Sequence, residues 1–150
     1  MVKQETLSAS LEDYLEAIHH IVATKKAARA KDIARRRQVN GSSVTGALRA
    51  LAARELVNYA PYDVITLTRK GERIARDIVR RHQALRDFFV KVLDVEETLA
   101  DRCACRMEHA LPREILDQLA RFVEFVDTSA GADATWLDEF AHYRTAKKRR

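Results

Sequence analysis

Hydrophobic residues recur every three or four positions through most of the chain, which predicts helices with one buried face. The first such stripe consists of Leu11, Leu15, Ile18 and Val22. Ser10 stands just before it, and Asp13 follows three residues later, a pattern typical of a helix N-terminus. We therefore expect the first helix to begin with Ser10 as its cap.

Two short helices are predicted next, over residues 30–37 and 42–54, with a tight turn over 38–41 between them. This arrangement is a candidate helix-turn-helix. Residues 56–60 and 64–68 then favour two short strands around a turn over 61–63. A helix-turn-helix followed by a β-hairpin is the arrangement of a winged helix.

The rest of the chain is predicted to be helical. A long helix is expected from residue 69 to about residue 93, and a second with Asp94 as its cap. A third covers 111–126, a linker covers 128–132, and a final helix covers 136–147 before a basic tail. Only four Gly and two Pro are present, which also favours helices. We expect a mainly α fold, with a winged helix-turn-helix domain over 1–71 and an all-helical domain over 72–150.

Composition narrows the class of protein. The chain has 150 residues, 47% of them hydrophobic and 33% charged, and its formal net charge is +5, so nucleic acid is a plausible partner. We expect no membrane association, because no apolar run approaches the ~20 residues needed to cross a bilayer. Without a recognisable signal sequence, and with two cysteines only one residue apart, we expect a cytoplasmic protein with reduced thiols.

One stretch, from Asp101 to Leu111, carries candidate metal chemistry. In a helix, Cys105, Glu108 and His109 would share one face, and a thiolate, a carboxylate and an imidazole together suit a transition metal. Cys103 would point to roughly the opposite side. The spacing alone is equally compatible with a buried free cysteine beside a surface Glu-His pair.

Candidate DNA contacts follow from the helix-turn-helix and the hairpin. Small polar side chains at the start of the second helix leave room to approach a groove, and nearby basic or aromatic side chains can reach the backbone. The residues are Arg36, Asn40, Ser42, Ser43, Thr45, Arg49 and Tyr62.

Assembled in this order, the chain resembles the diphtheria-toxin-repressor and manganese-transport-regulator family of metal-dependent repressors. The resemblance runs from about Ser10 to Thr128 and is carried by several separated motifs. They are Leu-Glu-Asp-Tyr-Leu-Glu over 11–16, Ser-Ser-Val-Thr over 42–45, Leu-Thr-Arg-Lys-Gly over 67–71, Arg-His over 81–82 and Ala-Cys-Arg-Met-Glu-His over 104–109.

The resemblance implies a homodimer that represses metal-uptake or metal-homeostasis genes by binding a palindromic operator when Fe2+ or Mn2+ is bound. It places the metal ligands at Asp13, Glu16, His82, Cys105, Glu108 and His109. It implies no enzymatic activity and no small-molecule substrate, and the chain lacks an H-E-x-x-H motif that would favour a metallo-hydrolase.

This chain also departs from the family pattern. The manganese branch usually has a carboxylate at the position of Cys105, and the iron branch usually has a Met at the position of Asp13, so the choice of metal stays open. Arg86 and Asp101 occupy ancillary-site positions of the iron branch, and a cationic Arg86 argues against a second metal there. A thiol-based redox repressor that senses through its cysteines is the alternative function.

Overall fold

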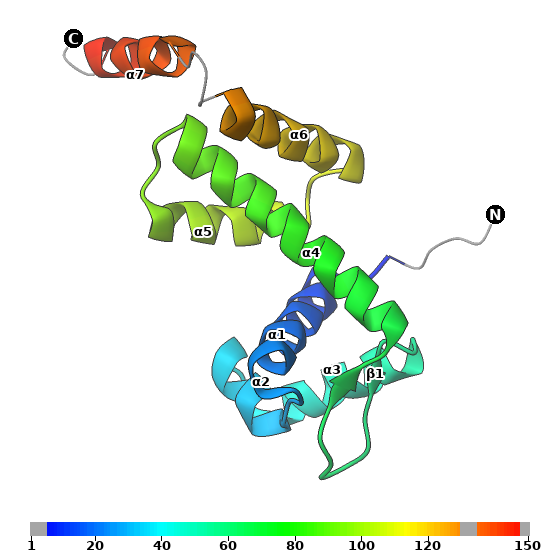
Figure 1. The fold of residues 1–150 in the computed structure, drawn as a ribbon. Coiled ribbons are helices and arrows are strands. Elements are labelled where there is room, and N and C mark those ends of the chain that lie inside the picture. Colours follow the sequence, from blue (N-terminus) through cyan, green and yellow to red (C-terminus); the bar gives the residue numbers. More distant parts are fainter. Residues whose placement is uncertain (1–5, 130–134, 148–150) are drawn as a thin grey trace. The chain divides into compact units, whose positions relative to one another are not determined.

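The computed structural model describes residues 6–129 and 135–147 and divides the chain into two compact units, 1–80 and 81–150. The first unit contains α1 (Ala9–Lys25), α2 (Ala30–Arg37), α3 (Gly41–Ala53), β1 (Val57–Asn58) and β2 (Thr66–Leu67) (Figure 1). The long helix α4 (Arg69–Asp87) begins in the first unit and ends in the second.

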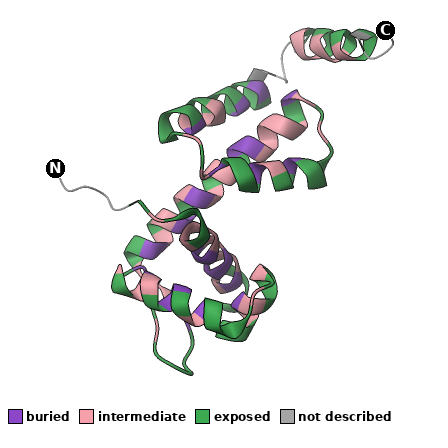
Figure 2. Cartoon of the chain, turned by 180° about the vertical axis from the view of Figure 1, so that it is seen from behind, coloured by how far each residue is buried: buried purple, intermediate pink, exposed green. Residues whose placement is uncertain are grey.

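The first helix begins two residues earlier than the sequence suggested. Ser8 is the N-cap, and its side chain accepts a hydrogen bond from the backbone N–H of Leu11. The prediction that Ser10 caps this helix is therefore wrong, because Ser10 already lies inside it. Of the predicted stripe, Leu15 and Ile18 are fully buried, whereas Leu11 and Val22 are partly buried against the same core. Figure 2 shows buried positions along α1.

The helix-turn-helix is formed by α2 and α3. The α2 helix covers the predicted residues and α3 starts at Gly41, one residue early; Ile33, Val44, Leu48 and Leu51 are fully buried. Gln38 ends α2 in a left-handed conformation, and the Asn40 side chain caps α3 by accepting from the backbone N–H of Ser43. The two helices are thus joined by a turn of only three residues, 38–40.

The wing is shorter than predicted. Its antiparallel strands pair only Val57 with Leu67 and Asn58 with Thr66, and the hairpin gains one further bridge between Ile65 and Ala28. Ala28 precedes α2, so two backbone hydrogen bonds of 2.7 and 2.8 Å join the wing to the start of the helix-turn-helix. The predicted winged helix is therefore present within a mainly helical fold.

The junction between the wing and α4 explains the motif over 67–71. The Thr68 hydroxyl donates to the carbonyl of Glu55 at 2.7 Å and accepts from the N–H of Gly71 at 3.0 Å, which caps α4. A Cβ at Gly71 would lie 1.8 Å from the carbonyl oxygen of Leu56. Only glycine allows α4 to begin so close to the strand.

The second unit is entirely helical over its described residues. After α4, the chain widens into a π-helical turn, η1 (Phe88–Val92), so the predicted continuous α-helix to about residue 93 is interrupted. It continues through α5 (Glu97–Met107), α6 (Arg113–Ser129) and α7 (Thr135–Lys147). Leu85, Ala104 and Leu116 form a small buried core, with Phe89 packed against it.

Two local predictions for this unit are wrong. Glu96, not Asp94, caps α5, because the Glu96 carboxylate accepts from the backbone N–H groups of Thr98 and Leu99. Thr128 and Ser129 belong to α6 rather than to a linker. The rest of the predicted linker, 130–132, and the basic tail over 148–150 lie outside the described residues. Among the described helices, none is both long and apolar enough to cross a membrane.

Candidate metal centre and nucleic-acid interface

The imidazole of His82 is the centre of a cluster of donor groups in the second unit. Its Nδ1 lies 2.7 Å from Glu108 Oε2 and 3.8 Å from Cys105 Sγ. Its Nε2 lies 2.8 Å from Asp101 Oδ1. Helix α4 supplies the histidine, and α5 with its C-terminal end supplies the other three groups.

Burial differs sharply among these groups. Glu108 is completely buried, only 13% of the His82 side chain is exposed, and 56% of the Asp101 side chain is exposed. Cys105 is also exposed. The cluster therefore runs from a buried carboxylate through the imidazole to groups at the surface of the unit.

The metal-free cluster is held together by charge. Both ring nitrogens of His82 face carboxylate oxygens, which accept hydrogen bonds and cannot donate them when ionised. The hydrogen bonds with Cys105 and Glu108, together with that to Asp101, raise the pKa of His82 from 6.5 to about 11 despite its burial. The ring is therefore an imidazolium at neutral pH.

The C-x-x-E-H motif is arranged differently from the single helical face that its spacing suggests. Helix α5 ends at Met107, Glu108 is its C-cap residue, and His109 lies beyond the helix. His109 Nε2 is 3.3 Å from Glu108 Oε1, and Arg81 donates to the backbone carbonyl of Glu108 at 3.2 Å. Cys105 and Glu108 lie close together because the side chain of each approaches Nδ1 of His82.

The donor set of the second unit fits a first-row divalent metal. His82, Asp101 and Cys105 each offer one ligand atom, and these atoms lie within 4.8 Å of one another. Glu108 adds a buried carboxylate oxygen beside the same imidazole. Imidazole nitrogen, carboxylate oxygen and thiolate sulfur are all ligands that such metals accept.

The two other predicted ligands, Asp13 and Glu16, lie on α1 in the first unit. Asp13 accepts a hydrogen bond from Arg37 at 2.9 Å, and Glu16 lies 3.5 Å from Nε2 of His20. Within their own unit, both carboxylates therefore face cationic or titratable side chains. Their assignment to one site with the ligands of the second unit stays a prediction.

Three predicted DNA contacts line one open hollow of the first unit. Thr45 and Arg49 from α3 and Tyr62 from the wing border a space of about 430 Å3, and Tyr62 is fully exposed at the hairpin tip. Arg29 and Lys31, at the start of α2, line the same hollow. The sequence analysis did not include these two cations among the DNA contacts. The run of basic residues around the start of α2 could have indicated them.

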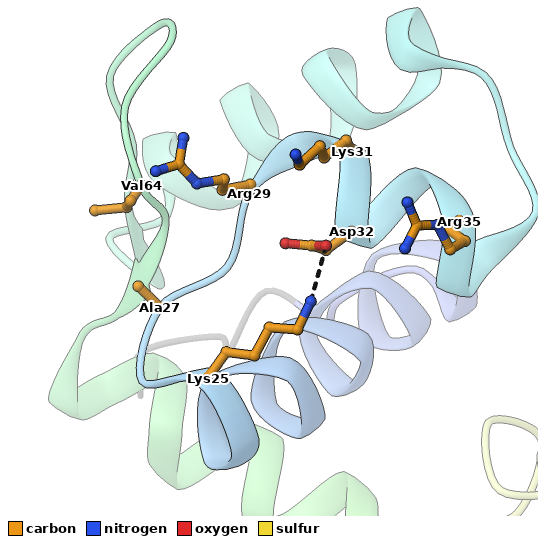
Figure 3. A pocket seen from close by; sticks show the side chains of 7 residues that line it. All are labelled: Lys25, Ala27, Arg29, Lys31, Asp32, Arg35 and Val64. Carbon is orange, nitrogen blue, oxygen red and sulfur yellow. Dashed lines mark hydrogen bonds and ion pairs between the residues drawn. The ribbon is translucent and has the colours of Figure 1, made fainter.

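A second hollow, of about 500 Å3, is also bordered by cations (Figure 3). Lys25 at the end of α1 reaches Asp32 on α2 with an ammonium-to-carboxylate distance of 3.0 Å, and this hydrogen bond lowers the pKa of Asp32. Arg29, Lys31 and Arg35 surround the pair. The cationic side chains around this hollow therefore outnumber its lining carboxylate, Asp32, and leave a net positive charge.

The other predicted DNA contacts do not line the hollow bordered by Thr45. Asn40 and Ser42 bond one another at the α3 N-terminus, where Asn40 acts as the helix cap, and Ser43 is exposed beside them. Arg36 borders a third hollow, of about 420 Å3, together with Arg35 and His20. Asn40 therefore has a structural role whether or not it also contacts DNA.

The two units define a winged-helix regulator with a metal-binding helical domain, and comparison with known proteins identifies its family. Residues 6–65 match the iron dependent repressor N-terminal DNA binding domain, and residues 68–136 match the iron dependent repressor metal binding and dimerisation domain. The chain belongs to this family, which includes the diphtheria-toxin and manganese-transport repressors. It is a metal-dependent transcriptional repressor.

Individual relatives agree with this assignment. An uncharacterised HTH-type transcriptional regulator of Methanocaldococcus jannaschii is 38% identical over 79% of this chain and 95% of its own length. The HTH-type transcriptional regulator MntR of Shouchella clausii is 34% identical over 77% of this chain and 80% of its own. These relatives are regulators rather than enzymes, which confirms that the chain is not an enzyme.

A solved structure shares the fold. A manganese-dependent transcriptional repressor in complex with manganese is 28% identical, has a TM-score of 0.70, and is matched over 77% of this chain. The chain spans about half of that protein, 53% of its length.

Proposed function

We propose that this chain is an Fe2+- or Mn2+-dependent repressor that binds a palindromic operator as a homodimer and controls metal-uptake or metal-homeostasis genes. The observation that carries the proposal is the His82 cluster, in which a buried carboxylate, an imidazole and a thiol meet within a domain described as metal-binding. The division of labour follows the expected domains: 1–71 contacts DNA, and 72–150 binds metal and dimerises.

The proposed ligands are Asp13, Glu16, His82, Cys105, Glu108 and His109. Cys105 and Glu108 already face Nδ1 of His82. Asp13 and Glu16 are included on the strength of the family resemblance. A bound divalent cation would supply the positive charge that lets carboxylates and a thiolate approach one another. Fe2+ and Mn2+ remain equal candidates because Cys105 favours the softer ion and the carboxylates favour the harder one.

The proposed ligands come from both units. Asp13 and Glu16 belong to the first unit, and the other four belong to the second. Two recognition helices must lie about one DNA turn apart, ~34 Å, to read a palindrome. A tenfold preference of the metal for the competent arrangement would contribute about 1.4 kcal/mol toward DNA binding.

The decisive experiment measures binding to the protein's own promoter DNA under reducing, oxygen-free conditions, with chelator, Mn2+ or Fe2+. We expect at least about tenfold tighter binding with one of the metals, and loss of this effect in Cys105→Ala. Cys103→Ala is the matched control, because it removes a thiol two residues away on the same helix. Equal affinity with chelator and metal would refute the metal switch.

The DNA interface is tested separately by substituting Arg49, which lines the same hollow as Thr45. Arg49→Ala should weaken operator binding and lower the salt dependence by about one counterion if the guanidinium contacts a phosphate. Arg121→Ala, which removes an exposed cation from α6, serves as the control. An unchanged salt slope in Arg49→Ala would remove this residue from the interface.

The homodimer is supported by apolar side chains that are exposed in the isolated chain. Ile115, Phe122 and Phe125 on α6 are 52%, 37% and 54% exposed. A carboxylate in such a contact would be buried without a partner, so Phe125→Glu should dissociate a dimer built on α6. Sedimentation of the wild type as a monomer at micromolar concentration would contradict the proposal.

A thiol-based redox repressor is the second candidate, and the position of Cys105 favours it. The thiol is exposed and lies 3.8 Å from Nδ1 of His82, so an oxidant can reach it. In that case peroxide, rather than a chelator, should release the promoter DNA, and Cys105→Ala should bind DNA regardless of either reagent.

A further inference from the structure

Asp101 was not among the predicted ligands, yet it lies against the imidazole at the centre of the cluster. Its Oδ1 is 2.8 Å from Nε2 of His82, on the opposite edge of the ring from Glu108 and Cys105. Asp101 and Cys105 are four residues apart on α5 and therefore share a face of that helix. One helix thus presents a carboxylate to one ring nitrogen and a thiol to the other.

An imidazole that binds a metal through one nitrogen must keep that nitrogen free of its proton, and the hydrogen bond made by the other nitrogen selects this tautomer. In His82, the nitrogen nearest the buried carboxylate and the thiol is Nδ1. A carboxylate that accepts from Nε2 keeps the proton on Nε2 and fixes the rotation of the ring.

We propose that Asp101 is a positioning residue that, by accepting a hydrogen bond from Nε2 of His82, keeps Nδ1 facing Cys105 and Glu108 as the metal-binding nitrogen. This role deepens the proposed function and rests on His82 being a ligand. The Asp101 side chain is more than half exposed and is not part of the small core of its unit, so packing does not account for its position against His82.

The geometry also offers a competing arrangement. His82, Asp101 and Cys105 could hold an ion directly, because one donor atom from each lies within 4.8 Å of the others. In that arrangement Nε2 would be the metal-binding nitrogen and Asp101 a ligand. The two arrangements therefore differ in which ring nitrogen carries the proton once metal is bound.

The test uses the full chain labelled with 15N at histidine and loaded with Zn2+, a diamagnetic probe. Two-bond proton–nitrogen correlation spectra report the state of each ring nitrogen, and His82→Gln assigns the signal. We expect Nδ1 of His82 to be metal-bound and Nε2 to be protonated. Zinc on Nε2 would overturn the positioning role in favour of direct ligation by Asp101.

Three variants complete the test, with zinc affinity measured by competition with a chelator. Asp101→Ala should lose about 10- to 100-fold in affinity and give mixed nitrogen signals. Asp101→Asn, whose amide oxygen can still accept the Nε2 proton, should keep the wild-type signals and lose only a few-fold in affinity. Asp127→Ala removes a comparably exposed carboxylate, 51% against 56%, from the same unit and should behave as wild type.

Two further results would count against the inference in different ways. Wild-type affinity and wild-type signals in Asp101→Ala would overturn the role of Asp101 and leave the ligand set intact. A wild-type spectrum in which neither nitrogen of His82 carries zinc would overturn the ligand set itself, and the role of Asp101 with it.

Discussion

Metal binding should release a proton from His82, and this exchange sets how affinity depends on pH. The imidazolium is held by Glu108 and Asp101 at 2.7 and 2.8 Å, and its neighbours raise the pKa to about 11. Because a metal needs the lone pair of the ligating nitrogen, one proton must leave at any pH below that value. One proton changes affinity about tenfold per pH unit, so this group alone gives about 100-fold, or about 2.7 kcal/mol, between pH ~6 and pH ~8.

The assay measures the concentration of free Mn2+ by electron paramagnetic resonance, in oxygen-free and weakly coordinating buffers. The slope of log affinity against pH should fall by about one in His82→Gln, because glutamine has no proton to release. His142→Gln on α7, an exposed histidine, should keep the wild-type slope. Calorimetry in buffers of different ionisation enthalpy counts the protons directly. Fewer than one proton released by the wild type, or equal slopes in the wild type and His82→Gln, would refute the reasoning.

The same proton affects the stability of the metal-free protein. The pKa of His82 is higher in the folded state than the 6.5 of the unfolded state, so its stabilising contribution is complete below about pH 6.5. It then declines as pH rises and is lost above the folded pKa of about 11. The melting temperatures of wild type and His82→Gln should therefore converge as pH rises from about 6.5 to about 10. A gap that widens over this range would contradict the assigned shift.

Three further substitutions test the first unit. Gly71→Ala would place a Cβ 1.8 Å from the backbone oxygen of Leu56, so the strand or α4 must move and the free energy of unfolding should fall by about 1–3 kcal/mol or more in urea denaturation. Gly46→Ala, a helical position with no atom within 4 Å, should instead gain up to about 1 kcal/mol, and a loss as large as that of Gly71→Ala would disprove the steric argument. Arg37→Gln removes the guanidinium 2.9 Å from Asp13; if that carboxylate is a ligand, metal affinity measured with a chelator should rise several-fold, and a fall would count against the assignment.

Local sequence pattern predicted the helix-turn-helix well because its determinants are local. The boundaries of α2 and α3 follow from hydrophobic residues three or four positions apart and from breaks at Gln38 and Asn40. The caps were harder to predict. Ser8 and Ser10 are both good capping residues, so residue type could not choose between them. Before α5, residue type favoured Asp94, but Glu96 is the cap.

Periodicity and motif spacing act over a few residues, so they were enough to predict the helical class and the wing and to indicate candidate donors around position 105. Which groups contact His82 depends instead on how the helices pack in three dimensions. Asp101 and Glu108 lie 19 and 26 residues further along the chain, and the packing of α5 against the widened end of α4 brings them to opposite edges of the ring. No short-range pattern encodes that approach, because it depends on how two helices pack around a small shared core rather than on the spacing within either helix.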